Sequence, residues 1–255
     1  RWMPQMWVGD DERGMTLMTE TEKHHHRNRC NDVEQRSDGN VLKVYLVDAP
    51  VQVSDPLHYR YAWQATPVRP KPDPKQWHWV YSEIQKPGFY KRAFASFGPS
   101  ERWALAGISY PYLEGSRRAV MRRTKKMRDQ GVHVCPYWGT NQVTSVAPEL
   151  KPFMREWETY PKSTIGQRGS IPPRIFACLE SDSYADYMVW ALAKVFDDVG
   201  YTGVYIDASS HRCSNHYHGC GWWDEERGEW RPKHNMFAWR ETYKRMYKVC
   251  RERGT

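Results

Sequence analysis

Hydrophobic and polar positions follow two different patterns along the chain. Up to residue 66 the apolar residues alternate with polar ones as they do in strands, most clearly at 14–19, 41–47 and 57–63. Asp38-Gly39 is typical of a hairpin turn, and no helical period is present. We therefore predict that residues 1–66 form part of a β-sandwich.

A proline-rich segment separates the two patterns. Residues 66–74 carry four prolines, which are unfavourable in a helix interior or a central strand. We interpret residues 67–87 as an interdomain linker.

After the linker, short apolar runs alternate with helical patterns. The pattern predicts strands at 103–110, 132–137, 174–179 and 203–207, and helices at 116–130, 148–157, 184–199 and 235–251. Such alternation predicts an α/β fold with a parallel sheet and outer helices.

The clearest helix begins near residue 184. Its apolar residues recur at helical spacing on one face: Tyr184, Tyr187, Met188, Ala191, Leu192 and Val195. Ser183 can cap the start of this helix, and Gly200 stands where a C-terminal glycine is favoured. In the last helix we expect Met236, Tyr243, Met246, Tyr247 and Cys250 to be buried.

The predicted elements form about four βα units over residues 88–255. A complete (β/α)8 barrel of the TIM type takes about 200 residues or more, so these units suffice for half of one. An open doubly wound sheet is the alternative. The chain starts at Arg1 and stops just after a helix, at Thr255, and we interpret it as carrying a partial barrel behind a partial sandwich.

Asp207 is the sharpest candidate for chemistry. It ends the predicted strand 203–207, and active sites of parallel α/β folds lie at the carboxyl ends of strands. A carboxylate there can act as nucleophile, acid or base, although it can also bind backbone amides in a turn. Glu180 follows the strand 174–179 in the same way and is a candidate second carboxylate, whereas Asp182 fits a helix start.

Aromatic residues flank these positions. Tyr137 and Trp138 follow the second strand, and Trp222 and Trp223 stand in the long polar segment after Asp207. Aromatic faces can stack on sugars, and they also pack in cores. We predict all four as substrate-binding residues.

The segment after Asp207 also holds Cys213, His216, His218 and Cys220 within eight residues. Zinc sites usually draw their ligands from two separated pairs, so this spacing is a weak metal signal. Stabilisation of the loop, by a metal or a Cys213–Cys220 disulfide, is our first interpretation. Substrate binding by His216 or His218 is the second, and a catalytic metal is the third.

Composition and charge exclude several classes of function. Mean hydropathy is −0.85 and the chain has no membrane-spanning apolar run. The formal charge is +8, but the densest basic group falls on the predicted helix 116–130, where a solvated face explains it. Nucleotide-binding glycine loops, serine-hydrolase elbows and His-Glu-x-x-His motifs are absent from the sequence. Cys135, Cys178 and Cys250 read as core residues.

Several short stretches together resemble one family. They are Trp7-Val8-Gly9 with Arg13-Gly14, Gln64-Ala65-Thr66-Pro67-Val68, Pro136-Tyr137, Gly203-Val204-Tyr205-Ile206-Asp207 and His218-Gly219-Cys220-Gly221. They are similar to bacterial glycoside-hydrolase-like proteins with an N-terminal β-sandwich and a barrel, related to the family 123 β-N-acetylgalactosaminidases. The resemblance implies glycan hydrolysis with Asp207 in the active site. The adjacent Asp-Glu pair of family 123 is missing, because Ala208 follows Asp207, so substrate-assisted catalysis does not carry over.

These observations together predict a glycoside hydrolase that acts on an oligosaccharide or polysaccharide through carboxylate catalysis. The alternative is a non-catalytic glycan-binding or structural fragment of a larger carbohydrate-active protein. We predict no cofactor, no nucleic-acid partner and an exported protein, although no signal peptide is visible in the chain.

Overall fold

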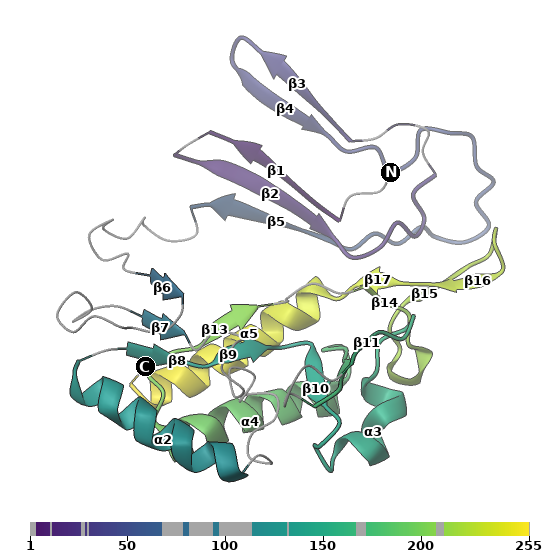
Figure 1. The fold of residues 1–255 in the computed structure, drawn as a ribbon. Helices are drawn as coiled ribbons and strands as arrows, with labels where there is room; N and C mark the ends of the chain where they lie inside the picture. The colour runs from purple at the N-terminus through teal and green to yellow at the C-terminus, as the bar shows by residue number, and fades with distance from the viewer. Residues whose placement is uncertain are drawn as a thin grey trace. The chain divides into compact units, whose positions relative to one another are not determined.

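The computed structural model describes residues 4–10, 12–26, 29, 31–67, 79–81, 94–96, 114–131, 133–166, 172–207 and 212–254. The chain divides into two compact units (Figure 1). The first unit comprises Arg1–Lys71 and Trp222–His234, and the second comprises Pro72–Gly221 and Asn235–Thr255. The linker predicted at 67–87 lies mostly outside the described residues, and one strand begins within it at Trp79.

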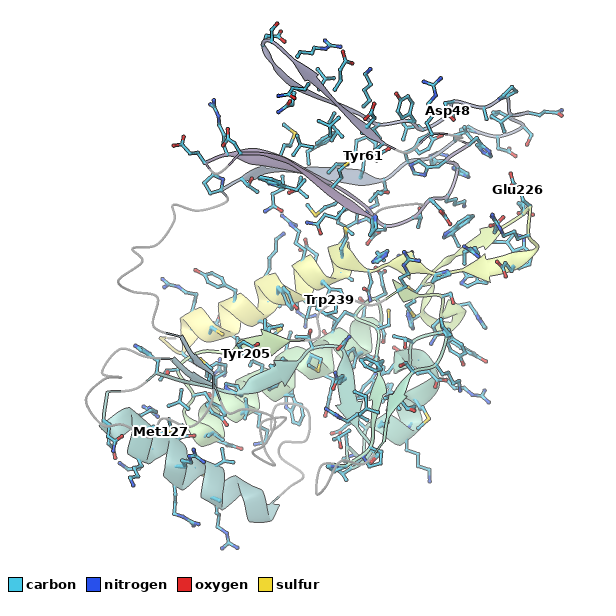
Figure 2. All side chains as sticks on the ribbon, turned by 45° about the horizontal axis from the view of Figure 1, so that its top comes forward. Asp48, Tyr61, Met127, Tyr205, Glu226 and Trp239 are labelled. Atoms are coloured by element: carbon cyan, nitrogen blue, oxygen red, sulfur yellow. The ribbon has the colours of Figure 1, made fainter. Side chains whose placement is uncertain are left out.

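The first unit contains a three-stranded antiparallel sheet. Its strands are β1 (Gln5–Gly9), β2 (Gly14–Thr19) and β5 (Tyr61–Thr66), with β2 in the centre. The predicted strand 14–19 is confirmed. The strand predicted at 57–63 begins later, at Tyr61, which Figure 2 labels on β5.

A separate hairpin joins β3 (Asp32–Arg36) to β4 (Gly39–Lys43). The turn signal at Asp38-Gly39 is therefore confirmed. The strand predicted at 41–47 ends earlier, at Lys43. The β-sandwich stays a prediction, because the described sheets of this unit are a three-stranded sheet and small hairpins.

The resemblance motifs of the first unit meet around one tryptophan. The Trp7 indole lies so close to Gly14 that an added Cβ there would be 2.7 Å from its ring, and Gly9 is equally crowded. Trp7 Nε1 donates to Thr66 Oγ1 over 3.0 Å. These motifs therefore have a packing explanation that involves no catalysis.

Residues 222–234 belong to the first unit and form a second hairpin. Its strands are β15 (Trp222–Asp224) and β16 (Glu229–Arg231), followed by β17 (Lys233–His234). Glu226 marks the hairpin tip in Figure 2. The backbone N–H of His234 donates to the carbonyl of Glu20 over 2.8 Å, which ties the hairpin to the end of β2.

The second unit contains the parallel strands that the sequence predicts. β6 (Trp79–Tyr81) pairs with β7 (Phe94–Ser96), which pairs with β8 (His133–Cys135), and all run parallel. Past Pro136, β9 (Tyr137–Gly139) pairs in parallel with β13 (Tyr205–Asp207). The strand predicted at 132–137 is divided at Pro136 between β8 and β9, which belong to different sheets. The strand predicted at 203–207 is shorter and begins at Tyr205, and 103–110 lies outside the described residues. A mixed α/β architecture is present, and the barrel stays a prediction.

The structure corrects both the length and the pairing of the strand predicted at 174–179. β12 (Arg174–Phe176) is shorter and pairs antiparallel with β10 (Gln142–Thr144) on one side and β11 (Thr164–Ile165) on the other. β12 therefore belongs to a separate sheet from the parallel pair β9–β13. A short buried apolar run carries no sign of its pairing direction, which is why the sequence misassigned it.

Four described helices match their predicted positions. They are α2 (Glu114–Asp129), α3 (Leu150–Trp157), α4 (Asp182–Val199) and α5 (Met236–Glu252). α4 packs against both α2 and α5, and α2 also contacts β8 (Figure 1). All six predicted residues of the α4 stripe are buried, at 7% exposure or less.

The ends of α4 confirm one predicted cap and correct the other. Gly200 ends the helix with φ +75°, the left-handed conformation that favours glycine. Ser181 is the N-cap, because its hydroxyl accepts the N–H of Tyr184. The predicted cap, Ser183, instead donates to Glu156 and accepts from the indole of Trp157.

The other two long helices follow their expected faces to different degrees. Of the five α5 residues predicted to be buried, Met246 is buried, whereas Met236, Tyr243 and Cys250 are half-buried. The α5 residues that are buried are Trp239, Thr242, Met246 and Val249, and Figure 2 labels Trp239 on this helix. Tyr247, predicted to be buried, is 53% exposed. On α2 the apolar Met127 is buried while Arg118, Arg122, Lys125, Lys126 and Arg128 are exposed, as a solvated basic face requires. None of the helices in the described part of the chain has the length and apolarity that crossing a membrane requires.

Candidate functional site

The predicted catalytic position lies at the end of two neighbouring parallel strands. In the β9–β13 ladder Ile206 is opposite Trp138 and Asp207 is opposite Gly139. Both strands end at this point, so Asp207 stands at a carboxyl edge of the parallel pairing. The side chains of Tyr137 and Asp207 lie outside the described part of the structure.

Trp138 does not have the exposure that a sugar platform needs. Its side chain is 0% exposed and belongs to the main core, where Ile206 also packs. A ring in this position cannot stack on a glycan without leaving the core. We therefore correct its role from substrate binding to packing.

Glu180 and Asp207 do not lie at the ends of neighbouring strands in one sheet. It follows β12, whose described partners are β10 and β11 rather than β13. Its backbone N–H is directed to the thiol of Cys178. The sequence therefore placed Glu180 correctly after a strand, but in the wrong sheet.

Trp222 and Trp223 lie on the first-unit hairpin. In its register Trp223 is directly opposite Trp230, and these two side chains are 43% and 40% exposed. Trp222 is opposite Arg231 and is less exposed. The Trp223 indole donates to Glu225 over 3.1 Å, which fixes its ring.

Four metal-ligating side chains converge in the second unit. The Sγ atoms of Cys178, Cys213 and Cys220 and a ring nitrogen of His218 all lie within 4.8 Å of one another. The three cysteines are 0% exposed and His218 is half-buried. The three residues carry thiols rather than disulfides, so the Cys213–Cys220 disulfide considered from the sequence is not formed.

Hydrogen bonds between the Asn215 side chain and backbone groups shape the loop that carries three of these ligands. Cys213 ends β14 (Arg212–Cys213), and His218 ends the 3-10 helix η2 (His216–His218). Asn215, 0% exposed, caps η2 by accepting the N–H of Tyr217 and donates from Nδ2 to the carbonyls of Arg155 and Glu158, each over 2.8 Å. The loop is thereby fixed against the end of α3.

The two histidines of η2 occupy different environments. His218 Nδ1 lies against the backbone carbonyl of Glu156, and its Nε2 is 3.8 Å from Cys213 Sγ. A ring nitrogen beside a carbonyl must be the protonated one, so Nε2 carries the lone pair that faces the sulfurs. His216 is exposed and stacks on Tyr217. Of the two predicted histidines, only His218 enters the cluster.

The sulfurs receive hydrogen bonds from nitrogen donors. Asn235 Nδ2 donates to Cys178 Sγ over 3.3 Å, and the backbone N–H of Asn215 donates to Cys213 Sγ over 3.4 Å. Hydrogen bonds from the Cys178 and Cys220 thiols lower the pKa of Cys213. The bond with Cys213 raises the pKa of Cys178, and the bonds with Cys178 and Cys213 raise the pKa of Cys220.

Cys178 is the functional residue that sequence reasoning missed. It stands 35 residues before Cys213, inside the strand predicted at 174–179, and the apolar residues around it indicate a core position. The antiparallel placement of β12 is what brings it to the loop, since Cys178 donates its backbone N–H to the carbonyl of Trp157 at the end of α3. The only signal in the sequence was the number of cysteines.

Comparisons with known proteins add little. No family model matches the chain, and no curated protein matches it. Among solved structures, an α-galactosidase from Thermus thermophilus in complex with stachyose has a TM-score of 0.32 and 11% identity, over 51% of this chain and 26% of that one. A cycloisomaltooligosaccharide glucanotransferase from Paenibacillus sp., complexed with cycloisomaltoheptaose, has a TM-score of 0.38 and 8% identity, over 77% and 36%.

Both neighbours are carbohydrate-active enzymes, and this chain spans roughly a quarter and a third of their lengths.

Proposed function

We propose that this chain belongs to a carbohydrate-acting protein in which Asp207 contributes a carboxylate to a glycan-cleaving site. The supporting observation is the register of the parallel strands β9 and β13, in which Gly139 and Asp207 form the last pair. Carboxyl ends of parallel strands are where α/β enzymes place their reacting groups. The family resemblance of residues 203–207 agrees with this position.

The packing of Trp138 and Ile206 indicates which face of the two strands the proposed site uses. These two residues pack into the helix-covered core, and successive side chains of a strand alternate between its faces. The alternation leads us to propose that Asp207 serves the face opposite that core. Glycosidases generally need a second carboxylate, and Glu180 is not supported for that role.

The test is turnover of a panel of aryl glycosides and oligosaccharides by the parent chain and by Asp207→Asn. Loss of a general acid or base lowers turnover by roughly two orders of magnitude or more. Asp129→Asn is the matched control, because Asp129 is an exposed α2 carboxylate paired with Lys125. Equal turnover by Asp207→Asn and Asp129→Asn, with all proteins folded, would remove Asp207 from the reaction.

A second candidate function is glycan binding without cleavage, and the hairpin of the first unit favours it. Trp223 and Trp230 present two cross-strand indoles that are 43% and 40% exposed, and such rings can stack on the apolar faces of sugars. Trp223→Ala should then weaken oligosaccharide binding measured by calorimetry, while the half-buried Tyr45 changed to Phe should not. Unchanged affinity in Trp223→Ala would reject the hairpin as a glycan platform.

A further inference from the structure

The geometry points to a structural zinc site in the second unit, formed by Cys178, Cys213, His218 and Cys220. Three thiolates and one imidazole are a known ligand set for tetrahedral Zn²⁺. This inference is independent of the proposed glycan function, since none of the four residues was needed there.

The distances fit one ion of this kind. A tetrahedral site with Zn–S distances of about 2.3 Å separates its sulfurs by about 3.8 Å. Cys178 Sγ and Cys220 Sγ are 3.8 Å apart, and Cys213 Sγ is 3.8 Å from His218 Nε2. The remaining ligand atoms lie within 4.8 Å, so small side-chain rotations suffice to bring all four onto one ion.

The groups around the ligands are those that a zinc site requires. A ligating histidine usually donates its other ring N–H to a carbonyl or carboxylate, and His218 has the Glu156 carbonyl in that place. The N–H groups of Asn235 and Asn215 are directed at Cys178 and Cys213. Such donors stabilise thiolates, because a hydrogen bond to the charged form favours it.

The arrangement also explains why the ligands are buried. Three buried thiolates would repel one another, but Zn²⁺ neutralises two of the three charges and the N–H donors face the sulfurs. Binding releases the thiol protons to solvent as the Zn–S bonds form. A Cys213–Cys220 disulfide would leave both Cys178 and His218 without a role, so it accounts for fewer of the observed contacts.

The site is structural rather than catalytic. All four positions of a tetrahedral ion are taken by protein atoms, whereas catalytic zinc keeps a position open for water or substrate. The ion would join the residue after β12 to the loop 213–220, whose contacts already reach the end of α3. Its effect is to fix this irregular loop where apolar burial is small.

Metal content of the chain, purified under reducing conditions without chelators, tests the inference. We expect one zinc per chain by elemental analysis. Replacement by Co²⁺ should give the visible ligand-field bands of a tetrahedral site and a thiolate charge-transfer band. A folded chain that contains no zinc and takes up neither ion would overturn the inference.

Two pairs of variants assign the ligands. His218→Ala is matched by His216→Ala on the same 3-10 helix, and Cys220→Ser is matched by Cys250→Ser, a thiol of α5 outside the cluster. Loss of a group that hydrogen-bonds to a metal ligand already weakens metal binding by about 10–100-fold, so each ligand variant should weaken it by at least about tenfold. Both controls should retain one zinc. Equal zinc affinity in His218→Ala and His216→Ala would contradict the assignment.

If a ligand variant fails to fold, the unmodified chain still decides the question. A mercurial that modifies thiols should release one zinc into a metallochromic indicator in step with the reaction of three buried cysteines. Zinc that is released without reaction of those thiols, or recovery of Cys213 and Cys220 as a disulfide in metal-free protein, would overturn the site.

Discussion

The helical core of the second unit and the loop at 212–221 are held together by different means. In the core, α4 buries Tyr184, Met188, Leu192 and Val195 at 0% exposure, and the hydrophobic effect suffices to fix them. The loop buries few apolar side chains. It depends on the Asn215 side chain, which donates to backbone carbonyls at the end of α3, and on the converging sulfurs and imidazole.

The difference shows what kind of change each region tolerates. A packed core responds to lost volume, because the cavity left behind does not fully close. A loop held by four ligands responds to loss of the ion or of one ligand, since its remaining contacts are few. The following changes separate these two modes of stabilisation.

Removal of the metal is expected to have the largest effect, and to be confined to the loop. Structural zinc contributes about 10 kcal/mol or more in zinc-finger peptides, so chelation should raise amide exchange in residues 212–221 by roughly a hundredfold or more. Exchange in the middle of α4 should change little. Hydrogen-exchange mass spectrometry checks this, and equal loss of protection in both regions would show that the loop and core are one cooperative unit.

Leu192→Ala should destabilise the core and leave the metal site intact, the converse of metal removal. Leu192 is 0% exposed, and truncation of such a residue costs about 2–5 kcal/mol of unfolding free energy. Urea denaturation should show that loss, while the folded variant should still bind one zinc. Trp190→Ala, at a position 44% exposed on the same helix, should cost clearly less. A similar cost for the two would mean that burial does not determine the stability of α4.

Two glycines with the same left-handed backbone conformation allow the two regions to be compared. Gly200 after α4 and Gly219 after η2 have φ of +75° and +73°, where an L side chain costs about 1–2 kcal/mol. A Cβ at Gly200 would also meet the end of the exposed, flexible Arg128 side chain, which can move aside at small cost, whereas Gly219 has open space. In metal-loaded protein Gly200→Ala and Gly219→Ala should therefore lower the melting temperature by similar amounts. A much larger loss at one of the two glycines would contradict the account that the backbone conformation alone sets the cost.

The smallest expected effect concerns the cap of α4. Ser181→Ala should cost about 1 kcal/mol, the usual value for a lost N-cap, and should speed exchange of the Tyr184 amide that Ser181 accepts. Ser183→Ala removes the bonds to Glu156 and Trp157 instead, so it should leave that amide protected. NMR exchange rates distinguish the two serines.

The regular part of the fold could be predicted from the sequence because its signals are local. The helical stripe of α4, the glycine at 200 and the hairpin turn at Asp38-Gly39 each follow from neighbouring residues. The direction of β12 could not be predicted, since Arg174–Phe176 carries no mark of its partner strands.

The residues of the candidate sites also divide into those that local sequence predicts and those that depend on the tertiary fold. Asp207 could be placed at a strand end from the apolar run before it. The burial of Trp138 and the exclusion of His216 from the cluster depend on side-chain directions that spacing does not give. Cys178 could not be assigned because its partners are 35 to 42 residues away, and only the tertiary fold brings them together.

X-ray absorption at the zinc edge of the purified chain is the most direct test of the central claim. We expect one zinc per chain, with about three sulfur neighbours near 2.3 Å and one nitrogen near 2.0 Å, the distances of a closed structural site. A shell made of oxygen and nitrogen alone, or a spectrum unchanged in His218→Ala, would show that Cys178, Cys213, His218 and Cys220 do not hold the metal.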